Sequence, residues 1–177
     1  MIRFSAISHR LHFKKPAATS RGALVDRDLW LIEARTNASS TVVGVGEAGI
    51  VPGLSVDDLP DLDARLQQLL AALNAAQLTL PDASGEPLGD VTMLLAPFRH
   101  LLAPLPALHF GIETALLQLL HGGGDILFPT PFTAGATTLA THGLIWMDTP
   151  SALLAQVQAK IDAGFTVIKM KVGAAPW

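Results

Sequence analysis

Residues 143–172 decide the fold, and they read GLIWMDTPSALLAQVQAKIDAGFTVIKMKV. Residues 143–147 and 165–172 are short apolar runs bounded by turn residues, which is typical of buried strands. The residues between them predict a helix, with one apolar face, Ser151 as its N-cap and Gly164 at its end. A strand, a helix and a strand with tight connections form a βαβ unit, which requires a parallel sheet.

The residues that precede this unit predict an antiparallel sheet followed by helices. Three segments joined by short links favour strands, which indicates a meander: residues 2–13, 24–34 and 41–47. Helical periodicity begins near Ser55, and Asp57 and Asp58 are expected in the first helical turn, where negative charge is favoured. Residues 79–90 predict a loop, and two further helices are expected over residues 91–102 and from 107 to the glycines that begin at 122.

These patterns predict an α+β domain over residues 1–130 and the first βαβ unit of a truncated (β/α) barrel over residues 131–177. A parallel sheet of two strands is buried on both faces and needs further strands beside it. Only 15% of the residues are charged and the mean hydropathy is +0.41, whereas about 25% charged residues is usual. We therefore expect the N-terminal portion of a longer enzyme, with a core whose other half is absent.

The composition excludes several classes of protein. The chain has no cysteine, which excludes thiolate catalysis and cysteine-bound zinc. The net charge of −3 gives no basic surface for nucleic acid. No apolar stretch has the length of a membrane span or a signal peptide, so we expect a cytoplasmic protein without membrane contact.

A glycine motif at residues 44–49, GVGEAG, satisfies the dinucleotide-binding pattern G-x-G-x-x-G. Such a fingerprint must open a helix after a parallel strand. Here the motif ends the predicted meander, and Pro52 and Gly53 follow before any helix. We therefore interpret these glycines as structural.

Two lysines in the last predicted strand are candidates for chemistry. Lys169 and Lys171 are two positions apart, so their side chains point to the same side of the strand, opposite to Ile168 and Met170. In a parallel barrel this side is the interior, where charge is tolerated near the C-terminal mouth that holds barrel active sites. The pattern leaves two interpretations open: an active-site pair, or an edge strand whose lysines face water.

Four stretches resemble the enolase superfamily, and most of all its o-succinylbenzoate synthase branch. The stretch from 143 to 174 is similar to barrel strand 1, helix 1 and strand 2 with a Lys-x-Lys pair. KPAATSRGAL, GVGEAGIVPGLSVDDL and HFGIETALLQLLHGGG resemble the N-terminal capping domain of that superfamily. The resemblance implies that residues 1–130 form the capping domain of a mandelate racemase/muconate lactonizing enzyme-like protein.

The resemblance also implies a reaction and its site. Enzymes of this kind remove a proton α to a substrate carboxylate and stabilise the enediolate on Mg²⁺; in this branch a dehydration yields o-succinylbenzoate for menaquinone synthesis. Lys171 matches the general base and Lys169 its neighbour, which tunes the base and helps to hold the carboxylate. Ser20, Arg21 and Leu54 match the two capping loops that close over a small carboxylate substrate.

The family's metal ligands are carboxylates on later barrel strands, and none of that sequence is present here. The resemblance therefore implies Mg²⁺ for the complete enzyme, no metal ligand in this chain and no activity of the chain by itself. Two alternatives stay open: a fragment of an N-acylamino acid racemase or dipeptide epimerase, and a non-catalytic remnant of a capping domain. The exposed edge of the last strand predicts a partner, either the missing barrel strands or a second copy.

Overall fold

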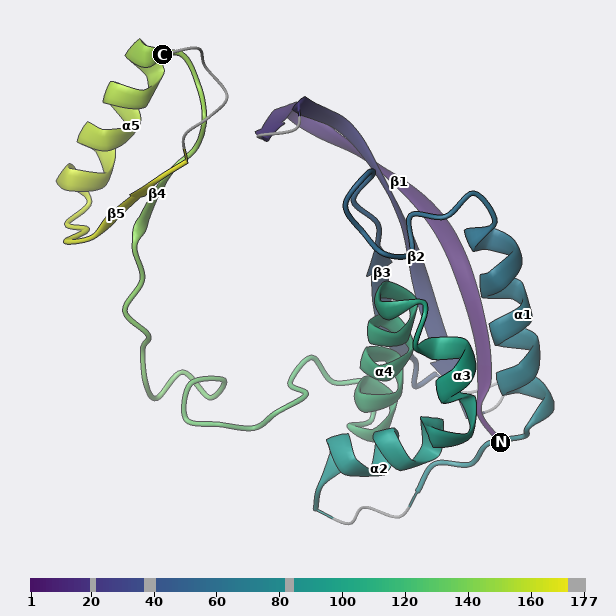
Figure 1. The fold of residues 1–177 in the computed structure, drawn as a ribbon. Coiled ribbons are helices and arrows are strands. Elements are labelled where there is room, and N and C mark those ends of the chain that lie inside the picture. Colours follow the sequence, from purple (N-terminus) through teal and green to yellow (C-terminus); the bar gives the residue numbers. More distant parts are fainter. Residues whose placement is uncertain (20–21, 37–40, 82–84, 172–177) are drawn as a thin grey trace. The chain divides into compact units, whose positions relative to one another are not determined.

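The computed structural model describes residues 1–19, 22–36, 41–81 and 85–171 (Figure 1). The chain forms two compact units. The first comprises residues 1–11 and 27–129, and the second comprises residues 12–26 and 130–177. The strands that pass from one unit to the other are β1 (Arg3–Thr19) and β2 (Gly22–Arg35).

The predicted antiparallel meander is confirmed. The sheet has the order β1-β2-β3, with β3 at Gly44–Gly49. The register of β2 and β3 pairs Leu29 with Gly49 and Ala34 with Gly44. The glycine motif therefore forms an edge strand of an antiparallel sheet, which is incompatible with a dinucleotide fingerprint.

The helices of the first unit follow β3 in the chain and share a core with the sheet. α1 is Leu62–Ala75, and α4 is Pro106–Leu120. Between them lie α2 (Pro87–Leu95), the 3₁₀ turn η1 (Ala96–Phe98) and α3 (Arg99–Leu102). Buried leucines of α1 and α4 pack with Ile2, Phe4 and Ile32 of the sheet region. This packing gives the α+β domain that the sequence predicts.

Two details of the helical prediction are wrong. The first helix begins at Leu62 and not near Ser55, so Asp57 and Asp58 precede it. The predicted loop over 79–90 ends early, because Pro87 occupies the first turn of α2. Proline is favoured there, since its missing N–H has no helical partner in any case.

Close contact between α4 and β3 explains the glycine motif. A Cβ added at Gly46 would collide with the backbone carbonyl of Gly111, and one added at Gly44 would collide with that of Ala115. Gly111 itself faces the backbone of Ala48. The helix backbone therefore lies directly on the strand backbone, which is possible only where side chains are absent or small.

Side-chain amides on the helices cover both edges of the sheet. Asn74 of α1 accepts a hydrogen bond from the Phe4 amide at 2.8 Å and donates one to the Phe4 carbonyl at 2.9 Å. Gln118 of α4 accepts a hydrogen bond from the Val45 amide at 2.6 Å. An unpaired strand edge is a template for association with another chain. These amides satisfy backbone groups that would otherwise be open to such pairing.

The second unit contains the predicted βαβ elements. β4 (Gly143–Ile145) and β5 (Ile168–Met170) form a parallel two-stranded sheet, and α5 is Pro150–Asp162. The N-cap of α5 is Thr149 and not Ser151, because the Thr149 side chain accepts the amide of Ala152. Val172 of the predicted strand lies outside the described residues.

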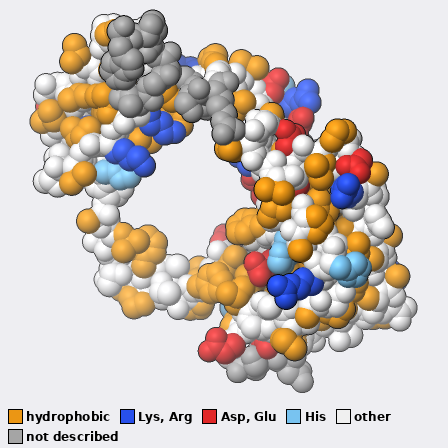
Figure 2. Space-filling model, in the orientation of Figure 1, with side chains coloured by type: hydrophobic (Ala, Val, Ile, Leu, Met, Phe, Trp, Pro, Cys, Tyr) orange, Lys and Arg blue, Asp and Glu red, His pale blue; other side chains and the backbone are white. Residues whose placement is uncertain are grey.

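Apolar side chains of the second unit remain exposed. Every residue of α5, all of which the structure describes, is at least partly exposed, and so are Val167 and Met170. Figure 2 shows apolar side chains on the surface of this unit. Within the described ranges, no helix has the length and apolar character to cross a membrane.

Replacement of Gly46 by alanine should destabilise the first unit strongly. The added methyl group must displace either α4 or β3, and overpacking of this kind costs about 1–3 kcal/mol or more. Urea unfolding followed by circular dichroism measures the loss of unfolding free energy. Gly89→Ala is the matched control: Gly89 lies within α2, its added Cβ would meet only Glu86 at 3.7 Å, and alanine favours a helix. Equal stability of the two variants would contradict the close-contact explanation.

Candidate functional site

Lys169 of β5 and Lys171, which directly follows β5, share the face of the sheet that α5 does not cover. Lys169 lies beside Leu144 in the parallel register, and the Lys171 amide donates a hydrogen bond to the Ile145 carbonyl at 3.1 Å. Gly143 and Ile145 lie on the opposite face of β4, toward α5. A Cβ added at Gly143 would be 3.0 Å from the Lys160 side chain of α5, and Ile145 is fully buried. Lys169 and Lys171 therefore project from the same face, away from α5.

Trp146 is the aromatic neighbour of Lys171. The Lys171 Nζ lies over the Trp146 ring, 3.5 Å from its centroid. Gln156 of α5 fixes the backbone of Trp146, because its Oε1 accepts the Trp146 amide at 2.8 Å and its Nε2 donates to the Trp146 carbonyl at 3.2 Å. The end of β4 is thus connected to α5 on one side and to Lys171 on the other.

Leu54 lies on a short loop with its own hydrogen bonds. Ser55 closes the loop, because its hydroxyl accepts the Val51 amide at 2.9 Å and its amide donates to the Val51 carbonyl at 3.0 Å. Asp58 accepts the Gly53 amide at 2.6 Å. Leu54 is 60% exposed and Val56 is 70% exposed. The loop therefore presents two apolar side chains on a backbone that is held from within.

Asp57 connects this loop to α4. Its carboxylate is 1% exposed and accepts the amides of Ala107 at 2.7 Å and Leu108 at 3.2 Å. These amides belong to the first turn of α4, whose own N-cap residue, Leu105, has no side chain that can accept a hydrogen bond. A carboxylate is well suited to this position, because the first amides of a helix lack partners and the helix dipole favours negative charge there.

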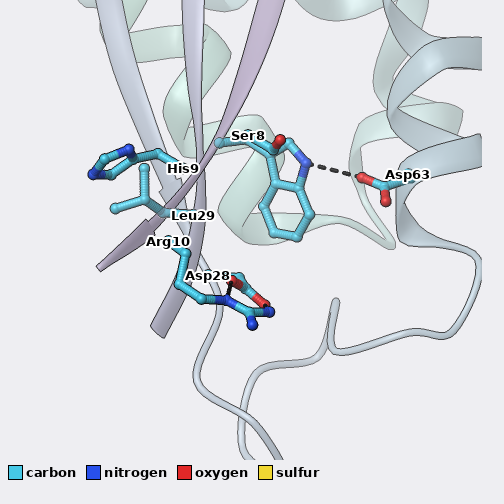
Figure 3. A pocket seen from close by; sticks show the side chains of 7 residues that line it. Ser8, His9, Arg10, Asp28, Leu29 and Asp63 are labelled. Carbon is cyan, nitrogen blue, oxygen red and sulfur yellow. Dashed lines mark hydrogen bonds and ion pairs between the residues drawn. The ribbon is translucent and has the colours of Figure 1, made fainter. Parts of the chain in front are cut away.

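The sheet of the first unit also carries a pocket of about 430 Å³ (Figure 3). Arg10 forms two hydrogen bonds with Asp28, at 2.6 and 2.8 Å, and the Trp30 indole N–H donates to Asp63 at 2.9 Å. The hydrogen bonds from Arg10 lower the pKa of Asp28, slight desolvation opposes them, and the positive charge of Arg10 adds to the lowering. Arg10 and Asp28 are therefore paired with each other, and neither is left as an unpaired charge for a ligand in the pocket.

Comparison with known proteins gives this geometry a context. No family profile matches the chain. The chain is 32% identical to the o-succinylbenzoate synthase of Desulfotalea psychrophila, over 93% of this chain and 47% of that relative. The crystal structure of MenC from the same organism superposes with a TM-score of 0.66 at 27% identity, over 96% of this chain and 48% of the other. The chain has the fold of the enolase superfamily. It resembles the N-terminal portion of the o-succinylbenzoate synthase branch.

Other enolase-superfamily structures share the fold at lower identity. A mandelate racemase/muconate lactonizing protein from Herpetosiphon aurantiacus has a TM-score of 0.63 at 22% identity, over 97% of this chain and 45% of the other. A dipeptide epimerase from Enterococcus faecalis, crystallised with Mg and a dipeptide, has a TM-score of 0.65 at 19% identity. The match covers 97% of this chain and 45% of the epimerase. The chain thus spans about half the length of the relatives that it matches.

The predicted site residues fall into three places. Lys169 and Lys171 belong to the second unit, and Leu54 belongs to the first, so each is described within its own unit. Ser20 and Arg21 lie outside the described residues. In the ranges that the structure does describe, no group of three or more His, Asp or Glu side chains could hold a metal ion. The described residues therefore do not by themselves form a Mg²⁺ site.

Three residues of structural importance to the site were not predicted from the sequence. Asp57 was expected in the first turn of α1, whereas it caps α4 from 50 positions away. Trp146 and Gln156 were part of a strand and a helix with no assigned role. Trp146 could have been found from the alternation, since it lies on the Leu144 face of β4, the face that Lys169 and Lys171 share in a parallel pair.

Replacement of Asp57 by alanine should lower the unfolding free energy by about 2 kcal/mol, because two buried amides lose their acceptor. Chemical denaturation measures the change. Asp58→Ala is the matched control, since Asp58 accepts an exposed amide from Gly53. A loss for Asp57→Ala no larger than that for Asp58→Ala would show that the cap contributes nothing beyond an ordinary loop hydrogen bond.

Replacement of Arg10 by glutamine should raise the pKa of Asp28, because the hydrogen bonds and the positive charge that lower it are removed. The lowered pKa implies stabilisation that is present at pH values above the pKa of the unfolded chain and is lost as the pH falls through the folded-state pKa. Carboxyl ¹³C NMR titration of both proteins measures the shift. Asp61, whose pKa is lowered by Arg65, serves as the internal reference and should not change.

Proposed function

We propose that this chain is the N-terminal part of an o-succinylbenzoate synthase. The observation that carries the proposal is the pair Lys169 and Lys171 on the face of β5 opposite to α5, in a chain that is 32% identical to a curated o-succinylbenzoate synthase. The reaction is a dehydration: a proton leaves the carbon α to a carboxylate, hydroxide leaves the neighbouring carbon, and a double bond forms. The product is o-succinylbenzoate, an intermediate of menaquinone synthesis.

In this proposal Lys171 is the general base, and its Nζ accepts the α-proton. Lys169 contributes a second positive charge on the same face, two residues away, which attracts the substrate carboxylate. Leu54 presents apolar surface to the substrate from a loop with fixed backbone, and Ser20 and Arg21 bind its polar groups. These assignments combine a capping domain over residues 1–130 with the start of a barrel over residues 131–177.

The complete protein is proposed to use Mg²⁺, as solved structures of related dipeptide epimerases contain Mg. Mg²⁺ would supply positive charge for the carboxylate of the substrate. The described residues contain no group of three or more His, Asp or Glu side chains that could hold it, and its ligands are proposed to come from the part of the relatives that this chain does not span. The chain by itself is therefore proposed to be inactive, and the exposed barrel elements are proposed to pair with the remaining strands.

A second candidate function is epimerisation of dipeptides or racemisation of N-acylamino acids. It has support from the shared fold of dipeptide epimerases and from the chemistry of the lysine pair, which suits proton removal from any α-carbon. A non-catalytic capping-domain remnant is the third candidate. The apolar residues of α5 are consistent with it, because Leu154 is 72% exposed and Ile161 is 53% exposed among the described residues.

A chimera tests these candidates directly. Residues 1–171 are joined to the portion of the Desulfotalea psychrophila o-succinylbenzoate synthase that follows the aligned region. We expect the chimera with Mg²⁺ to convert the hydrated precursor to o-succinylbenzoate, and the isolated chain to show no turnover. Lys171→Ala in the chimera should lower kcat by about 100-fold or more, because a positioned base contributes that much.

The control substitution is Lys160→Gln, which removes a lysine that lies on α5, away from the paired lysines. It should leave the rate unchanged. Exchange of the α-proton of dipeptides for deuterium without dehydration would favour the epimerase instead. A folded chimera without either activity would support the non-catalytic remnant.

A further inference from the structure

We propose that Trp146 is a positioning residue for Lys171: its indole ring is the platform on which the Lys171 ammonium rests. The inference rests on the proposed function in one respect, namely that Lys171 acts in catalysis. The contact itself is independent of that role. The Nζ atom lies 3.5 Å from the centroid of the indole ring, well inside the distance of about 6 Å at which a cation is attracted to an aromatic face.

The fold explains why the ring lies under this lysine and not under the other. β4 and β5 are parallel, with Leu144 beside Lys169 and Ile145 beside Met170, so the next pair in register is Trp146 beside Lys171. The Lys171 amide continues the ladder through its hydrogen bond to Ile145. Neighbouring residues of a parallel pair project to the same face, and Trp146 thus meets Lys171, whereas Lys169 meets an aliphatic side chain.

The platform is itself held in place. Trp146 follows the last residue of β4, where a backbone is free to fray, but Gln156 binds both its amide and its carbonyl. These two hydrogen bonds come from α5, on the opposite side of the strand from the lysines. The helix therefore fixes the backbone from which the indole ring projects, and the ring in turn contacts the Lys171 ammonium.

The other cation–π contact of this unit provides a comparison. Lys160 of α5 has its Nζ 5.3 Å from the ring centroid of Phe165, which is a longer contact than that between Lys171 and Trp146. The Trp146–Lys171 contact is shorter and uses indole, the ring with the strongest attraction for cations. A general base accepts the proton as an uncharged amine and becomes an ammonium, and its side chain needs a defined position for this transfer. Trp146 supplies that position for Lys171, and no ring does so for Lys169 within the described residues.

Competitive acetylation of the intact 177-residue chain tests this inference. The folded protein is labelled with limiting acetic anhydride, then denatured and labelled to completion with the deuterated reagent. Mass spectrometry of the chymotryptic peptide gives a light-to-heavy ratio for each lysine. Lys169 is the internal reference, because it lies on the same strand and the same face. We expect Lys171 to be labelled about two- to five-fold less than Lys169, as befits an ammonium held on an aromatic ring.

Three variants distinguish the effect of the aromatic ring on the acetylation ratio from the effects of apolar bulk and of strand pairing. Trp146→Phe keeps an aromatic face and should retain part of the difference, whereas Trp146→Leu gives apolar cover without one and should abolish it. Leu144→Ala removes an apolar side chain from the same face and should leave the Lys171 to Lys169 ratio unchanged. Equal ratios in Trp146→Phe and Trp146→Leu would overturn the inference, and so would loss of the difference in Leu144→Ala, which would attribute it to the pairing of the strands.

The measurement concerns the lysines alone and involves no turnover. A chimera without lyase activity would therefore refute the proposed reaction and leave the platform intact. Unchanged acetylation in Trp146→Leu would refute the platform and leave the proposed reaction intact.

Discussion

The first unit depends on the direct approach of one helix backbone to one strand backbone. Gly44 and Gly46 of β3 face Ala115 and Gly111 of α4, and a Cβ added at any of the three glycines would lie within 2.9 Å of another atom. Because α4 lies so close to the sheet, its leucines reach the core that α1 also enters. The sheet, α1 and α4 therefore share one core, and a change in the distance between α4 and β3 would open it.

Polar side chains complete what this close packing leaves unsatisfied. Asn74, Gln118 and Gln156 each extend from a helix and bind the backbone of a strand edge or strand end. Asp57 does the reverse: it extends from a loop and binds the amides at the start of α4. Buried or edge-lying backbone groups are costly when they lack partners. Asn74, Gln118 and Asp57 thus join elements that are 50 or more positions apart, whereas Gln156 joins α5 to the end of the preceding strand, ten positions away. Asp57 also connects the loop that carries Leu54 to α4.

The second unit differs from the first, because the two faces of its sheet carry different kinds of side chain. The α5 side buries Ile145 and leaves most of α5 partly exposed, whereas the opposite side displays two lysines and Trp146. The chain spans about half the length of the o-succinylbenzoate synthase that it matches. A face that joins positive charge to an aromatic ring suits a carboxylate substrate, and the exposed apolar residues suit further barrel strands. The two faces of this unit thus differ in charge and polarity, and the described residues contain no group of three or more His, Asp or Glu side chains that could hold a metal ion.

The sequence by itself determined the order of the elements, the parallel βαβ unit and the common face of Lys169 and Lys171, because each follows from local periodicity along the chain. It also excluded a dinucleotide site at residues 44–49, since the surrounding turns contradict one. It misplaced the start of the first helix and the N-cap of α5, where several neighbouring residues can serve as caps. Only the tertiary structure decided that Asp57 caps α4, that Gly46 meets Gly111 and that Trp146 meets Lys171. These contacts join residues that are 25 to 65 positions apart, and pairings at that range depend on how the elements pack and not on any local pattern.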